Sequence, residues 1–189
     1  MKGTKYRVQR DRDFKPHHIL IGTAKIALES AEAKTPGWLY YELTAITFSA
    51  LALEALTNSF GEKLVSRWDD FETASPIAKL RIICSRLLVE PDFEKEPWSV
   101  ALWLVKFRNK IAHAKPESIK FDKTMTENDF QKIQFEFPRS KLEMQINLEN
   151  AKRSVSTIDQ ILELFYLPLK SDEKYCLYSD GFSGTTSAC

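Results

Sequence analysis

The chain has few cysteines, and they do not show the spacing of a metal or disulfide site. Its 189 residues include three, Cys84, Cys176 and Cys189. An odd number at wide separation argues against both a disulfide framework and a zinc knuckle. We therefore expect a reducing, cytoplasmic environment and no metal site.

Long apolar runs and an excess of charge of one sign are also missing. No uninterrupted apolar run reaches the roughly 18 residues that a membrane span requires, and the polar, basic amino terminus lacks a signal-peptide core. The formal net charge is +1, so binding to nucleic acid would need a local basic patch. There is no glycine-rich phosphate loop, Gly-x-Ser-x-Gly elbow or Cys/His metal spacing. We expect no membrane association and no cofactor.

Apolar residues recur at three- and four-residue steps through most of the chain, which predicts helices. The length favours one domain, and we expect residues 16–168 to form an all-α bundle of about four to five main helices. The predicted helices span about 17–34, 38–65 and 140–166, with two more beginning at Ser75-Pro76 and Glu96-Pro97, where proline suits the first turn. The expected inward faces include Ile19, Ile26 and Ala33 on the first helix, and Ile77, Leu80, Ile83, Leu87 and Leu88 on the third.

Three segments lie outside this helical pattern. Residues 1–15 form a basic tail, which is either solvated or an arm that grips RNA. Residues 169–189 are polar and rich in small side chains, as in a flexible tail. Residues 116–138 form an extended connection with mixed signals: Thr126 to Asp129 resembles a helix start, whereas Ile133, Phe135 and Phe137 alternate as in a strand.

The helix that begins after Pro97 carries the candidate chemistry, in the order Arg108, Asn109, Lys110, Ile111, Ala112, His113. At roughly 100° per residue its core side holds Val100, Trp103, Leu104, Phe107, Ile111 and Ala114, and nearly opposite lie Ala101, Val105, Asn109, Ala112 and His113. A helix that is apolar on two sides usually has two neighbours. One is the bundle, and the other could be a second copy of the chain across a two-fold axis.

Arginine, amide and imidazole together suit cleavage of a phosphodiester. Asn109 and His113 are four residues apart, so we expect the amide to hydrogen-bond and orient the imidazole. Arg108 and His113 are roughly 140° apart around the helix, so a homodimer would be needed to line one cleft with both. Imidazole titrates near neutral pH and can move the proton of a ribose 2′-OH or of the leaving oxygen. A guanidinium can hold the phosphate oxygens as negative charge grows.

The segment 107–114, FRNKIAHA, at the end of a Trp- and Leu-rich helix, resembles the Arg-x4-His motif of HEPN domains. The resemblance covers about residues 17–168, and residues 53–58 (LEALTN) resemble the family's earlier long helix, which directs polar residues, here Glu54 and Asn58, toward the site. It implies a metal-independent endoribonuclease that acts as a homodimer in a toxin–antitoxin, abortive-infection or other antiviral system. The implied partners are RNA and an antitoxin or defence-system protein. The implied catalytic residues are Arg108, Asn109 and His113, and Lys106, Lys110 and Lys115 would extend the RNA-binding surface.

Other interpretations remain open at this point. The same fold could be a catalytically inactive module that dimerises or binds RNA or an antitoxin. The motif could also be coincidental, in which case Arg108 pairs with a carboxylate and His113 is buried. Glu54 could reach the cleft or be satisfied by a nearby lysine or backbone group, and the lysines could be ordinary surface residues. Arg12 and His17 repeat the motif's spacing, but Pro16 breaks any helix between them.

Overall fold

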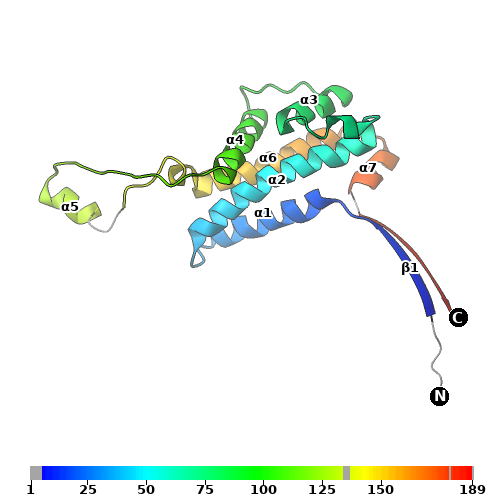
Figure 1. Ribbon diagram of the computed structural model, residues 1–189, viewed down its shortest axis with the longest axis horizontal. Helices are drawn as coiled ribbons and strands as arrows, with labels where there is room; N and C mark the ends of the chain where they lie inside the picture. Colours follow the sequence, from blue (N-terminus) through cyan, green and yellow to red (C-terminus); the bar gives the residue numbers. More distant parts are fainter. Residues whose placement is uncertain (1–5, 134–136, 179, 189) are drawn as a thin grey trace, which may run out of the picture.

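A computed structural model describes residues 6–133, 137–178 and 180–188 of the chain, and it confirms a largely helical domain (Figure 1). The elements follow in the order β1 (Tyr6–Asp13), α1 (Pro16–Glu32), α2 (Trp38–Leu64), a 3₁₀ turn (Trp68–Phe71), α3 (Pro76–Arg86), α4 (Trp98–Ala112), α5 (Glu127–Ile133), a 3₁₀ turn (Glu143–Gln145), α6 (Leu148–Tyr166), α7 (Ser171–Tyr178) and β2 (Gly181–Ala188).

Helix α2 is the centre of the bundle and packs against α1, α3, α4 and α6. Its length and apolar composition are also those of a membrane span, but half of the most apolar window is buried inside the bundle. The fully buried side chains Leu53, Leu56 and Phe60 face the core, where Phe60 lies 5.2 Å from Phe165 of α6 between ring centroids. Helix α2 is apolar on most of its sides because other helices pack against most of its sides.

The helix starts follow the local capping signals. The Ser75 hydroxyl accepts a hydrogen bond from the backbone N–H of Ala78 at the start of α3, and Pro97 immediately precedes α4. Helix α6 begins later than residue 140, because Asn147 supplies its N-cap by accepting a hydrogen bond from the N–H of Asn150. Such side-chain oxygens satisfy backbone donors that have no partner within the helix.

The predicted inward face of α1 is wrong. Ile19 and Ile26 are 61% and 66% exposed, whereas the alanines at positions 24, 27 and 31 are buried. These alanines recur at helical spacing, and their small side chains let α1 lie close along α2, which it contacts over its length (Figure 1). The helical period alone did not show whether the buried face of α1 is formed by alanines or by larger apolar residues.

Leu88 also departs from the predicted face of α3. The helix ends at Arg86, Leu87 is buried, and Leu88 has a positive φ of 57° and is 92% exposed. The change of backbone direction after the helix turns this leucine away from the core.

The two predicted tails contain regular structure in the described residues. Strand β1 pairs antiparallel with β2, in a register that sets Tyr6 opposite Ala188 and Asp13 opposite Gly181. The pair projects from the end of the bundle where α7 lies (Figure 1). At its base, Asp180 accepts hydrogen bonds from the Arg12 side chain and from the backbone N–H of Lys15, which join the strands to the start of α1. The Arg12 hydrogen bond lowers the pKa of Asp180.

An arm leaves the bundle after α4 and returns before α6. We use this name for residues 113–133 and 137–142; α5 lies near its far end (Figure 1). The predicted helix start at Thr126 is confirmed, since α5 begins at Glu127. The predicted strand is not found in the part that the structure describes: Ile133 ends α5 and Phe137 is exposed coil, while Phe135 lies outside the described residues.

Replacing Gly61 by alanine should destabilise the protein by about 2 kcal/mol. Gly61 is buried in α2, and an added Cβ would lie 2.2 Å from Cε2 of Trp68. The Trp68 ring cannot yield easily, since it is 7% exposed and contacts Phe71. Urea unfolding would measure the change.

Gly22→Ala is the matched control for this substitution. Gly22 is also inside a helix, but an added Cβ meets no atom within 4 Å, so alanine there should stabilise the protein by about 0.5 kcal/mol. A stabilised Gly61→Ala variant would show that the Trp68 contact is not tight.

Candidate active site

Arg108 is held in a defined orientation by two side chains. Its Nη2 donates to Glu54 Oε2 of α2 at 2.9 Å, and its Nη1 donates to Asn109 Oδ1 at 3.1 Å. The Arg108 and Glu54 side chains retain 37% and 30% of their exposure, so the ion pair is accessible to solvent. The guanidinium is therefore fixed in orientation, and the Glu54 carboxylate offsets its charge.

The predicted hydrogen bond between Asn109 and His113 is replaced by the bond between Asn109 and Arg108. What connects Asn109 to His113 is the backbone: the His113 N–H donates to the Asn109 carbonyl at 3.1 Å. Asn109 therefore orients the guanidinium instead of the imidazole. The wheel placed Asn109 and His113 on one face, but it could not show that the neighbouring Arg108 competes for the amide oxygen.

His113 is the C-cap residue that follows α4, and it is exposed. Its φ of −115° departs from the helical value, so the helix stops at this residue. This position leaves His113 open to a ligand.

Arg108 and His113 border different grooves. The first, which we call the Arg108 groove, has a volume of about 850 Å³ and lies between the start of α1 and the middle of α2; its lining includes Glu54, Asn58 and Arg108. The second, the His113 groove, has a volume of about 590 Å³ and lies at the base of the arm. One chain therefore does not bring Arg108 and His113 to a common ligand, as their angular separation on the helix predicted.

Only part of the predicted second side of α4 is accessible. Ala101 is fully buried and Val105 is half-buried, whereas Asn109, Ala112 and His113 are exposed. The bundle covers the first half of this side, so a second copy could meet α4 only near its carboxyl end. On the predicted core side, Ala114 lies beyond the helix and is exposed.

The two candidate supporting residues on α2, Glu54 and Asn58, line the groove of Arg108 and not that of His113. Glu54 is satisfied by Arg108, not by a lysine or a backbone group. Asn58 also lines the Arg108 groove, and its Oδ1 accepts a hydrogen bond from Lys79 Nζ at 3.0 Å. Lys79 is 4% exposed and lies 6.0 Å from the centre of the Trp68 ring. Lys79 was not predicted from the sequence, although its position on the buried face of α3 was an available signal.

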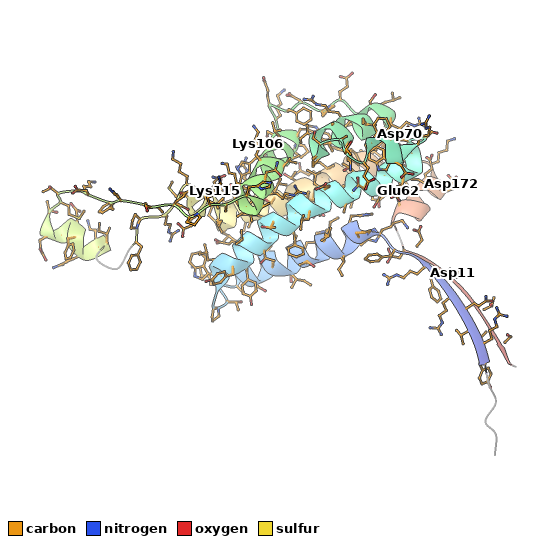
Figure 2. All side chains as sticks on the ribbon, in the orientation of Figure 1. Asp11, Glu62, Asp70, Lys106, Lys115 and Asp172 are labelled. Atoms are coloured by element: carbon orange, nitrogen blue, oxygen red, sulfur yellow. The ribbon has the colours of Figure 1, made fainter. Side chains whose placement is uncertain are left out.

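The three candidate lysines differ in their position relative to the two grooves. Lys110 and Lys115 line the His113 groove. Lys106 is exposed on α4 and is not among the residues that line either groove. Figure 2 shows Lys106 on the body of α4 and Lys115 where the arm leaves it.

His17 is not a second acid–base candidate at neutral pH. It is fully buried, and its Nδ1 lies 2.9 Å from Ser59 Oγ. Burial lowers its pKa to about 4, and the neighbouring His18 and Lys15 act in the same direction. A neutral, enclosed imidazole cannot exchange protons with a ligand, so the second Arg-x4-His spacing has no catalytic counterpart.

No protein-family model, curated protein or solved structure matches this chain. The described residues contain no group of three or more His, Cys, Asp or Glu side chains placed to hold a metal ion. Of the coincidental-motif interpretation, the structure confirms the carboxylate partner of Arg108 and contradicts the buried His113.

Proposed function

We propose that the protein is an endoribonuclease of the HEPN type that acts as a homodimer, with Arg108 of one copy and His113 of the other serving one phosphodiester. The observation that carries this proposal is the accessible end of α4, where a restrained guanidinium and an exposed imidazole lie near the only part of the second side that another copy can reach. Two-fold symmetry would place each Arg108 opposite the partner copy's His113.

The cleavage step follows from the chemistry of these groups. His113 accepts the proton of the ribose 2′-OH as that oxygen attacks the adjacent phosphorus, or donates a proton to the departing 5′-oxygen. Arg108 stabilises the charge that develops on the phosphate oxygens, while Glu54 and Asn109 keep the guanidinium oriented. The products are a 2′,3′-cyclic phosphate and a 5′-hydroxyl. A role as a toxin or antiviral effector rests on the HEPN resemblance.

Incubation with RNA in excess EDTA tests this proposal. We expect cleavage of an RNA oligonucleotide to a 2′,3′-cyclic phosphate end, with no cleavage of the all-deoxy oligonucleotide of the same sequence, because DNA lacks the attacking 2′-OH. Electrophoresis and mass spectrometry of the products would identify the ends. Cleavage of DNA, or activity that disappears with EDTA, would contradict the proposed chemistry.

A second candidate is a catalytically inactive HEPN-like module that binds RNA or an antitoxin. The Glu54 carboxylate favours it, because at 2.9 Å it already neutralises Arg108. The separate grooves of Arg108 and His113 favour it as well. RNA binding without cleavage in the same assay would identify this alternative.

A further inference from the structure

The His113 groove is built from three segments that are distant in the sequence. The end of α4 and its C-cap contribute Lys110 and His113, and the outgoing base of the arm contributes Lys115 and Glu117. The returning base and the 3₁₀ turn after it contribute residues 140–143 and Gln145. Both bases of the arm therefore lie beside His113. A volume of about 590 Å³ is within the range of pockets that hold small organic ligands.

Positive charge predominates in this groove. Lys110 at the end of α4, Lys115 at the outgoing base and Lys141 at the returning base all line it. All three lysines are exposed, and none has a carboxylate within 4 Å among the ion pairs of the described residues. Ammonium groups gathered without partners around a concave surface attract a polyanion.

The acidic residues offset this charge only in part. Glu143 Oε2 accepts a hydrogen bond from the Ser140 N–H at 2.7 Å, and the Glu143 N–H donates to Ser140 Oγ at 3.0 Å. The Ser140 N–H lowers the pKa of Glu143, so this carboxylate stays ionised. Three lysines and two carboxylates, Glu117 and Glu143, therefore line the groove, and a positive excess remains.

The same turn fixes the wall that carries Lys141. Ser140 and Glu143 close a capping box around it. Leu142 packs against the core and Ile146 is buried, so the segment is anchored directly after the lysine. The backbone that carries Lys141 is thus held in a defined position at the returning base of the arm.

We propose that the His113 groove binds the phosphodiester backbone of an RNA strand, with Lys141, at the returning base of the arm, as a positioning residue. The identity of the polyanion as RNA rests on the proposed function. Lys141 holds a phosphate next to the one that His113 acts on, so the groove sets which bond reaches the imidazole.

Lys141→Ala tests this proposal in two assays. Steady-state cleavage of a fluorogenic RNA should show KM raised about fivefold and kcat changed less than twofold, since Lys141 binds the strand and takes no part in proton transfer. Fluorescence anisotropy in the cleavage-blocked His113→Ala background should show weaker RNA binding. The slope of log affinity against log salt should fall in magnitude by about 1, as expected for the loss of one phosphate contact.

Two further variants provide the controls. Lys141→Arg retains the charge and should restore most of the affinity. Lys170→Ala removes another exposed lysine, immediately before α7 at the end of the bundle away from the arm (Figure 1), and should change neither KM nor the salt slope. The proposal that the groove binds RNA would be overturned if Lys141→Ala and Lys170→Ala had equal effects. It would also be overturned if the salt slope were unchanged in Lys141→Ala.

The assays separate failure of this proposal from failure of the nuclease proposal. RNA binding that depends on Lys141, without any cleavage, would support the proposed RNA-binding groove and contradict the proposed nuclease activity. Cleavage that depends on His113 but not on Lys141 would contradict the proposed RNA-binding groove and support the nuclease activity. Absence of both binding and cleavage would reject both.

Discussion

Replacing His113 by alanine should reduce the rate of RNA cleavage at least a hundredfold, the usual contribution of a positioned acid or base. The variant should fold normally, because His113 is exposed at the end of α4 and its side chain forms no hydrogen bond within the part of the chain that the structure describes. Single-turnover kinetics on a labelled RNA would measure the rate, with circular dichroism and urea unfolding to confirm the fold.

Lys170→Ala, purified in the same way, is the control for a contaminating nuclease. Its rate should equal that of the wild type, because the substitution lies away from both grooves. A His113→Ala preparation that cleaves at the wild-type rate would show that the imidazole is not the proton carrier.

Two inactive variants should restore activity when they are combined in one dimer. In a purified heterodimer of Arg108→Ala with His113→Ala, one composite site loses both groups, and the other retains an intact Arg108 from one copy and an intact His113 from the other. We therefore expect about half the wild-type rate per dimer, following from the two-fold symmetry. Co-expression with two different affinity tags and sequential purification would supply the heterodimer.

A heterodimer that pairs Arg108→Ala with a chain carrying both substitutions should remain inactive, because no site in it contains both groups. If the first heterodimer is inactive too, while both parent variants dimerise, then Arg108 and His113 do not act across the interface. The separation of their grooves in one chain makes this the direct test of a composite site.

The helices that follow local signals could be predicted closely. The prediction of 38–65 agrees with Trp38–Leu64 for α2, and the prolines at 76 and 97 mark the starts of α3 and α4. Caps, first-turn prolines and apolar periods act over a few residues, so their effect is visible without the fold. The Ser140–Glu143 capping box belongs to the same class of signal.

The contacts between distant segments could not be predicted in this way. Strands β1 and β2 pair although they lie near opposite ends of the chain. Because β2 is polar, it lacks the alternation of apolar and polar residues that would predict a strand. The alanines of α1 are buried in place of Ile19 and Ile26 because α1 lies close against α2. In both cases the outcome depends on a segment that is distant in the sequence.

For the candidate site, the sequence by itself determined which chemical groups are present and that Arg108 and His113 point in different directions from one helix, because the helical repeat sets that angle. Only the tertiary structure decided that Glu54 and Asn109 restrain Arg108 and that the returning base of the arm places Lys141 beside His113. The physical reason is that these contacts join residues from separate elements, and packing around α2 sets which elements meet.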